Sequence, residues 1–229
     1  MTSNRPGNVT VTNAQEQPPP GERRPIAARS HGWSQAAANV LIRAEASPNA
    51  ISIAGMLAAI AAGVCFAFAP RVAGIASIAL WLLAALLMQA RLVANMLDGM
   101  VALGRGVASP VGELFNDVPD RVSDSAVLIG VGCAAGDLAL GIGAALAAMA
   151  TAYVRALGRS IGAPSEFCGP MAKQHRMAAL TVLAVMECFT PVRWTMTIAE
   201  WCLWIILVLS LVTTIRRLAR TAAHLRGAR

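Results

Sequence analysis

The stretch that decides the fold is RLVANMLDGMVALGRGVASPVGELFNDVPDRVSD, residues 91–124. It is a polar insert between two apolar runs and holds five of the chain's twelve acidic residues. Asn95 and Asp98 lie three residues apart, so they share one face of a helix. Asn116 and Asp120 lie four apart and share another. Two helical faces with oxygen ligands predict a hard-cation site where they meet near a membrane surface.

The composition is that of a membrane protein. Of the 229 residues, 56% are hydrophobic and 14% are charged, and several runs carry no charge at all. The formal net charge is +7, but the arginines cluster at the ends of apolar runs. This placement is typical of a topology signal and argues against nucleic-acid binding. The five cysteines include no CxxC pair and lie mostly in or beside apolar runs, so we expect neither disulfides nor a zinc site.

The apolar runs predict an all-α, polytopic membrane protein with six transmembrane helices. At a rise of about 1.5 Å per residue, a run of some twenty residues spans the hydrocarbon core. The uncharged part of the third span is too short to cross alone, so its polar first turns must be buried in protein rather than in lipid. The expected spans are 50–69, 72–90 with an extension to Leu103, 112–136, 138–154, 177–190 and 195–215.

We expect four parts along the chain. Residues 1–30 show no apolar period and are predicted to form a disordered cytoplasmic tail. Residues 31–46 predict an N-terminal interfacial amphipathic helix anchored by Trp33, and a solvent-exposed helix that caps the bundle is the alternative. Residues 47–220 form the six-helix transmembrane domain with the candidate catalytic residues, and 221–229 form a basic cytoplasmic tail.

Basic residues are unevenly distributed between alternate loops. Six spans place both termini, the polar insert and the loop 155–176 on one side of the membrane. The loops on the opposite side hold only Arg71 and Arg193. By the positive-inside rule, both termini and the acidic insert face the cytoplasm, and we expect the chain in the cell inner (cytoplasmic) membrane.

The insert resembles the signature of the CDP-alcohol phosphotransferase family. That signature reads Asp, two residues, Asp-Gly, two residues, Ala-Arg, eight residues, Gly, three residues, Asp, three residues, Asp. The positions that match at the same spacing are Asp98, Gly99, Ala102, Gly112 and Asp120. The resemblance covers most of residues 31–220, including the six-span plan and the interfacial helix.

The chain departs from this signature at three positions. Asn95 and Asn116 stand where the family has its first and third Asp, and Leu103 stands where it has Arg. An Asn amide oxygen can bind Mg²⁺ or Ca²⁺ but brings no charge. Three consequences stay open: weaker metal binding, one firmly held ion, or loss of turnover.

The resemblance implies an integral membrane transferase of phospholipid biosynthesis. It would move a phosphatidyl group from a CDP-linked donor such as CDP-diacylglycerol to a small acceptor alcohol, phosphorylated or not, with release of CMP and with one or two Mg²⁺ or Mn²⁺ ions. Asp98 would bridge the ions, and Asp120 would act as general base or second metal ligand. The implied metal ligands are Asn95, Asp98, Asn116 and Asp120; the implied CDP contacts are Asn95, Gly99, Ala102, Gly112 and Asn116. A homodimer in membrane lipid is also implied.

Basic residues beside the fourth and fifth spans supply an acceptor hypothesis. Arg155, Lys173 and Arg176 flank the cytoplasmic ends of these spans. In the family that the insert resembles, basic residues here hold a phosphorylated acceptor, and Arg suits bidentate phosphate binding. The equal alternative is that these residues are topology anchors that face lipid headgroups.

Other readings compete with the transferase. The two Asn residues allow a catalytically weakened or inactive relative that binds nucleotide or lipid. A small transporter ranks last, because no charged or broken-helix site is expected at mid-membrane. Glu187 and Glu200 near the opposite face are expected to pair with Arg193 rather than to act in chemistry, and His175 is expected to be an ordinary loop residue.

Overall fold

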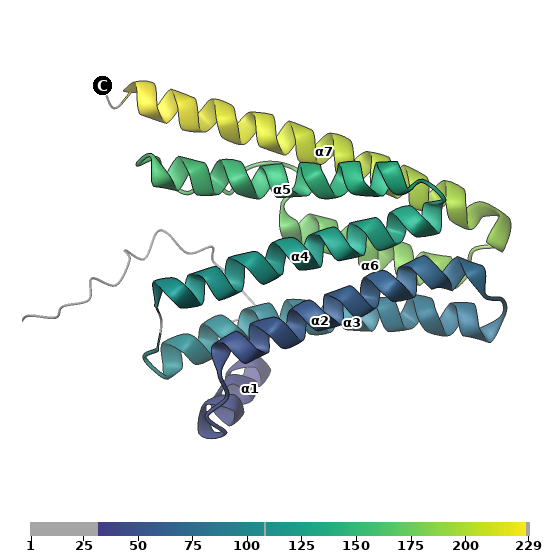
Figure 1. Ribbon diagram of the computed structural model, residues 1–229, viewed down its shortest axis with the longest axis horizontal. Helices are drawn as coiled ribbons and strands as arrows, with labels where there is room; N and C mark the ends of the chain where they lie inside the picture. Colours follow the sequence, from purple (N-terminus) through teal and green to yellow (C-terminus); the bar gives the residue numbers. More distant parts are fainter. Residues whose placement is uncertain (1–31, 108, 228–229) are drawn as a thin grey trace, which may run out of the picture.

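The apolar runs of the sequence form the long helices of the computed structural model (Figure 1). The structure describes residues 32–107 and 109–227, and of Pro110, Val192 and Arg193 the backbone alone. This part of the chain contains helices and no strand. The expected tail at residues 1–30 lies outside the described residues. The elements are α1 (Gly32–Arg43), α2 (Pro48–Phe68), the short 3₁₀ helix η3 (Ala69–Arg71), α3 (Ile75–Gly104), α4 (Pro110–Ala135), α5 (Leu138–Ser160), α6 (Lys173–Glu187) and α7 (Val192–Gly227).

Local sequence signals set where several helices begin. Pro48 occupies the first turn of α2, although Ser47 at the N-cap position makes no side-chain cap bond. Ser109 caps α4, because its hydroxyl oxygen accepts a hydrogen bond of 3.1 Å from the Gly112 amide. Asp137 caps α5 in the same way. These caps place the polar insert on two helices, the end of α3 and the start of α4.

Four helices in the described part of the chain are long and apolar enough to cross a membrane. They are the α2–η3 segment, α3, α5 and α7 from Trp194 onward, so the chain has the helices of a multi-pass membrane protein. Charged residues lower the hydropathy of α4, and α6 has 15 residues. Since α7 continues to Gly227, His224 and Arg226, expected in a separate tail, lie in its last turn.

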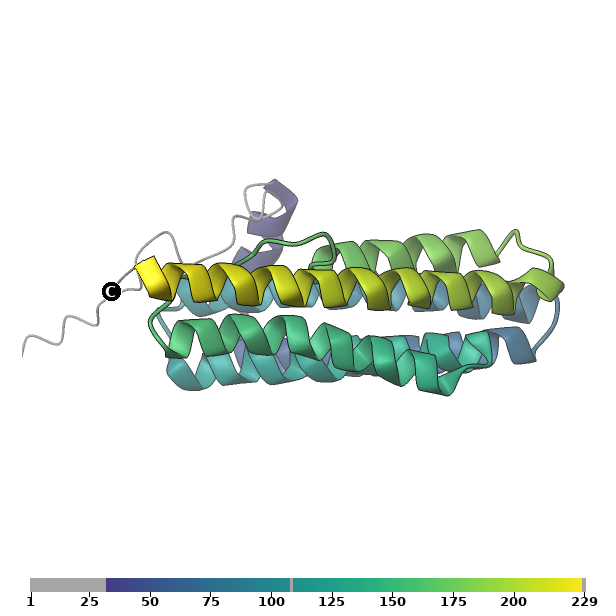
Figure 2. The same ribbon diagram turned by 90° about the horizontal axis from the view of Figure 1, so that it is seen from above.

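From α2 onward, the successive long helices run in alternating directions along the bundle (Figure 1). The start of α2 and the end of α7 therefore lie at the same end. The connection after α5 returns along the bundle before α6 begins, so α6 starts near the middle of its length (Figures 1 and 2). This return brings the first residues of α6 beside the inner turns of α4.

Glycines allow α4 to pack closely on both neighbours. A Cβ on Gly63 of α2 would run into the Ala126 carbonyl of α4, and one on Gly130 would run into the Gly63 backbone. A Cβ on Gly132 would lie 2.7 Å from the Gly141 Cα of α5. Such close backbone approach is the role of small residues in membrane helix packing. α2 packs along both α3 and α4, so it holds these two helices with their polar residues on a shared side.

Helix α1 packs against the last third of α3. Ala38 is buried there against Met96 and Leu97. Trp33, the expected interfacial anchor, is 53% exposed, and Val40 is 64% exposed. All five cysteines are free.

Candidate functional site

Asp98 is a buried carboxylate held in place by two donors. The Ser52 hydroxyl of α2 donates to Asp98 Oδ2 at 2.5 Å, and the Gly99 amide donates to Oδ1 at 2.6 Å. Only 3% of the residue is exposed. Both oxygens are therefore oriented before any ligand binds, which is the condition for a precise site.

Asp120 lies on α4 and is contacted by two cations. The Arg91 guanidinium of α3 donates to Asp120 Oδ1 through Nη2. The Lys173 ammonium at the start of α6 lies 2.5 Å from the same oxygen, without hydrogen-bond alignment. Since both cations contact Oδ1, Asp120 Oδ2 is engaged in neither ion pair. Three helices thus converge on one carboxylate.

Arg91 is the residue that connects the two helical faces predicted to carry metal ligands. It lies four residues before Asn95 and seven before Asp98, on the same face of α3. Its Nε donates to Ser123 Oγ at 3.0 Å, and Asp98 lies within electrostatic range of both Arg91 and Asp120. The prediction that the faces of Asp98 and Asp120 converge agrees with this geometry.

Sequence reasoning missed Arg91, Ser52 and Gly55. Arg91 had a signal, because a charged residue next to a long apolar run is costly unless it is paired. A Cβ on Gly55 would lie 2.8 Å from Ala94 Cβ and 3.0 Å from Arg91 Nη1, so the glycine makes room for the guanidinium. Ser52 and Gly55 lie on α2 within an apolar run, and nothing local indicates which helix they face.

Asn95 and Asn116 each have a buried side-chain oxygen without a hydrogen-bond partner. An unpaired buried acceptor is costly, so such atoms point to a missing donor or cation. Gly112 lies in the first turn of α4, and a Cβ there would meet only the Ser109 hydroxyl, at 3.4 Å. Ala102 lies partly buried on α3, close to its end.

The three residues predicted to bind the acceptor alcohol have different surroundings. Arg176 is buried, donates to Asp124 Oδ2 at 2.6 Å and to the Met171 carbonyl at 3.0 Å, and is 1% exposed. Lys173 contacts Asp120 as described above. Arg155 is half-buried, 3.7 Å from Asp117 Oδ1, and its guanidinium lies 5.6 Å from the centre of the Phe167 ring. Lys173 and Arg155 therefore lie nearer to solvent, and Arg176 lies inside the bundle.

Arg105 stands two residues beyond the position where the matched signature has Arg. Its Nη1 donates to the carbonyls of Glu45 and Ala46 at 2.9 and 2.8 Å. It thus ties the end of α3 to the loop between α1 and α2.

No three His, Cys, Asp or Glu side chains gather closely enough to hold a metal ion in residues 32–107 and 109–227. The available donors are instead mixed: the Asp98 carboxylate and the unpartnered amide oxygens of Asn95 and Asn116. Mg²⁺ is commonly held by one or two carboxylates together with substrate phosphates. The residues present therefore fit a single hard cation better than a pair of cations held by several carboxylates.

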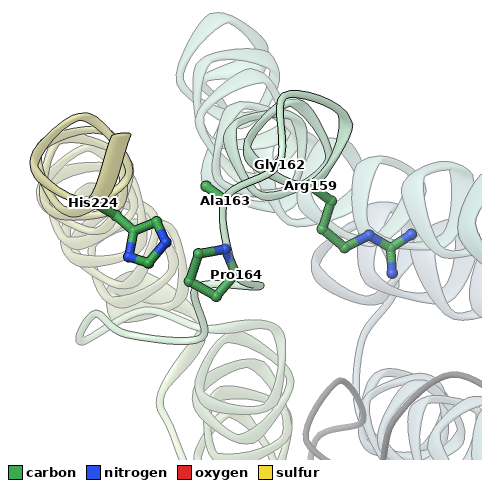
Figure 3. Close-up of a pocket in the computed structure, with 5 residues that line it drawn as sticks. All are labelled: Arg159, Gly162, Ala163, Pro164 and His224. Carbon is green, nitrogen blue, oxygen red and sulfur yellow. The ribbon is translucent and has the colours of Figure 1, made fainter. Parts of the chain in front are cut away.

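A separate cavity of about 520 Å³ lies between the ends of α5 and α7. Its lining residues are Arg159, Gly162, Ala163, Pro164 and His224. In Figure 3 the His224 ring points toward Pro164, whereas the Arg159 side chain extends away from both. Arg159 donates to Glu113 Oε1 at 2.7 Å, so it links α5 to α4. None of the acidic site residues lines this cavity.

Sequence-based predictions also concern Glu187, Glu200 and His175. Glu187 is buried beside Thr195, and Glu200 is exposed on α7. Their predicted partner, the Arg193 side chain, lies outside the described residues. His175 is exposed, and its Nδ1 lies 2.8 Å from the Pro170 carbonyl.

Three crystal structures of phosphatidylinositol phosphate synthase (PgsA1) from Mycobacterium tuberculosis share this fold. The structure with CDP-DAG bound has a TM-score of 0.67 at 21% identity, over 82% of this chain and 92% of that one. The complex with manganese and citrate has a TM-score of 0.69 at 20% identity, over 82% and 88%. The apo form has a TM-score of 0.63 at 21% identity, over 80% and 93%. PgsA1 is a CDP-alcohol phosphotransferase.

No protein-family model and no curated protein sequence matches the chain. At these identities, the likeness to PgsA1 establishes a shared fold over 80–82% of this chain and 88–93% of PgsA1.

Proposed function

We propose that the protein is an integral membrane CDP-alcohol phosphotransferase of phospholipid synthesis. It transfers a phosphatidyl group from a CDP-linked lipid such as CDP-diacylglycerol to an acceptor alcohol and releases CMP. The observation that carries this proposal is the buried contact between Asp120 and Arg91, which lies on the helical face that carries Asp98, with the two acids at the spacing of the signature. The fold shared with a CDP-DAG-bound synthase supports it.

The two carboxylates have separate roles in this proposal. Asp98, oriented by Ser52 and Gly99, is a metal ligand. Asp120 is the general base, because its Oδ2 is free of the two ion pairs and can accept the proton of the acceptor hydroxyl. Because the proton is removed as the hydroxyl attacks phosphorus, no separate alkoxide has to form.

The cofactor is Mg²⁺ or Mn²⁺. The unpartnered oxygens of Asn95 and Asn116 would hold it together with Asp98. When bound, the ion neutralises the diphosphate and the charge that develops on departing CMP. Asn95 and Asn116 also line the CDP position with Gly99, Ala102 and Gly112; two glycines without a side chain and one alanine leave the backbone accessible.

The acceptor binds on the basic side of the site. Arg155 and Lys173 are partly exposed and lie around Asp117 and Asp120, so a phosphorylated acceptor could displace one of these ion pairs. Arg176 supports the site from inside through Asp124. The alternative, that these residues anchor lipid headgroups, predicts no effect on acceptor binding.

The membrane arrangement that we propose uses all six long helices of residues 47–220. α4 and α6 complete the bundle beside the four clearly apolar spans, since the charges of α4 are paired within the protein. α1 lies in the membrane interface with the exposed Trp33 and Val40 toward lipid. Both termini and the site face the cytoplasm of the inner membrane, and the chain forms a homodimer.

A second candidate is a relative that binds nucleotide or lipid without turnover. The specific observations in its favour are the amides at Asn95 and Asn116 and the two cations on Asp120. This candidate predicts an inactive wild-type protein that gains metal-dependent turnover when Asn95→Asp and Asn116→Asp are combined.

The deciding experiment measures CMP release by the purified full chain from CDP-diacylglycerol with a panel of acceptor alcohols. We expect release that requires Mg²⁺ or Mn²⁺ and stops with EDTA. Asp120→Ala should lower kcat about 10²–10⁴-fold, the usual contribution of a general base, and Asp98→Ala should abolish release. Glu200→Ala, on the exposed side of α7, is the matched loss of an acid and should leave the rate unchanged.

An unchanged rate after either Asp replacement would exclude these site assignments. A wild-type chain without turnover, rescued by the two Asn→Asp changes, would establish the second candidate.

A further inference from the structure

We propose that the site holds one divalent cation, bound by Asp98 with the amide oxygens of Asn95 and Asn116, and that Arg91 supplies a fixed positive charge at Asp120 in place of a second cation. The inference rests on the proposed function and specifies the charge arrangement of the same site.

The acidic residues around the site are almost all neutralised by the protein itself. Asp117 contacts Arg121 at 3.3 Å and Arg155 at 3.7 Å. Asp124 contacts Arg176 at 2.6 Å. Asp120 contacts Arg91 and Lys173. Among these four carboxylates, counting the described residues, Asp98 alone has no Lys or Arg within ion-pair distance. Asp98 is therefore the one of these four carboxylates whose negative charge no Lys or Arg at ion-pair distance already balances.

Arg91 is built into the core rather than placed at its surface. It is 1% exposed, and Gly55 on α2 leaves the space that its Nη1 occupies. Ser123 donates its hydroxyl proton to the Pro119 carbonyl at 2.6 Å, so its oxygen faces Arg91 Nε as an acceptor. Residues from α2 and α4 thus hold the guanidinium against Asp120. A cation held in this way occupies the position of a counter-ion permanently.

Two amide oxygens would complete the set of protein ligands for a single ion. Asn95 and Asn116 each present a buried oxygen without a partner, and neither adds charge. Asp98 with two amide oxygens leaves coordination positions for the phosphates of a nucleotide, as is usual for Mg²⁺. A second divalent ion at Asp120 would lie next to the buried guanidinium and the Lys173 ammonium, and like charges repel strongly where water is excluded.

Counting bound Mn²⁺ tests the inference. The full chain in detergent is titrated with Mn²⁺ in the presence of CDP, and the free ion is measured by electron paramagnetic resonance. We expect one Mn²⁺ per wild-type chain and at least tenfold weaker binding in Asp98→Asn. Asn116→Asp with Arg91 intact should still bind one ion. Combining Arg91→Gln with Asn116→Asp should admit a second, because it removes the competing cation and adds a carboxylate.

Each alternative count overturns the inference. Two ions or none in the wild-type chain would do so, as would a second ion in Asn116→Asp alone. A folded Arg91→Gln/Asn116→Asp protein that still binds one ion would remove the role given to Arg91. If that variant does not fold, Arg91→Lys/Asn116→Asp keeps the charge and must bind one ion, and the wild-type and Asn116→Asp counts decide the matter.

CMP release measured on the same samples separates this inference from the proposed function. One bound ion without turnover would contradict the transferase proposal and leave the single-ion site in place. Two bound ions with turnover would support the transferase proposal and overturn the single-ion inference.

Discussion

The guanidinium of Arg91 on α3 contacts the carboxylate of Asp120 on α4 inside the helix bundle. α2 packs along both helices; its Gly55 lies against the Arg91 side chain, and its Ser52 donates to Asp98. Removing Asp120 would leave the buried Arg91 guanidinium without its carboxylate, which is costly. The pair therefore fixes the distance between the two helical faces that carry the candidate ligands.

Enlarging Gly55 should disturb this contact. Gly55→Ala places a methyl group 2.8 Å from Ala94 Cβ and 3.0 Å from Arg91 Nη1, so α2 or Arg91 must shift. Overpacking of this kind costs about 1–3 kcal/mol. We expect a lower thermal unfolding midpoint in detergent together with reduced CMP release. Gly143→Ala on α5 is the control, because a Cβ there meets nothing within 4 Å; equal midpoints for the two variants would contradict the packing argument.

Removing the Ser52 hydroxyl should weaken metal binding. Ser52 donates to Asp98 Oδ2 at 2.5 Å and so orients the candidate ligand. Loss of such an outer partner usually lowers metal affinity or activity about 10–100-fold. The measurement is the Mg²⁺ concentration that gives half-maximal CMP release in Ser52→Ala. Ser77→Ala removes a hydroxyl that donates to the Ala69 carbonyl, at the other end of the bundle, and should not change it.

Breaking the pair between Arg176 and Asp124 should destabilise the bundle more than removing both partners. Both residues are buried, so Arg176→Met alone leaves an uncompensated carboxylate. The expected cost is about 3–5 kcal/mol, and adding Asp124→Leu should recover much of it. Thermal unfolding of the single and double variants measures this. Arg159→Gln, in the exposed pair with Glu113, should cost no more than about 1 kcal/mol.

Kinetics of an Arg155 variant distinguish acceptor binding from lipid anchoring. If Arg155 binds a phosphorylated acceptor, Arg155→Gln should raise the KM for that acceptor about tenfold or more, since a hydrogen bond to a charged group contributes about 1.5–3 kcal/mol. The KM for CDP-diacylglycerol should stay constant. Arg71→Gln, in η3 at the opposite end of the bundle, is the control. An unchanged acceptor KM would favour the headgroup role.

Several features could be predicted because helical periodicity is a local property of the chain. The long uncharged runs predicted the helices α2, α3, α5 and α7, and Ser109-Pro110 marks the start of α4. The three- and four-residue spacings placed Asn95 with Asp98, and Asn116 with Asp120, on the faces that converge. The assignments of individual residues to metal, CDP and acceptor stay predictions.

The sequence by itself determined which side chains share a helix face, since about 3.6 residues make one turn whatever surrounds the helix. Only the tertiary structure decided which faces meet. It placed Ser52 and Gly55 against the end of α3, and it put Arg91 between the two ligand faces. It also returned the chain after α5 to mid-bundle, so that Lys173 and Arg176 bind the acids of α4 instead of lying on a surface loop. Contacts between distant segments depend on how whole helices pack, and the local sequence pattern does not determine that packing.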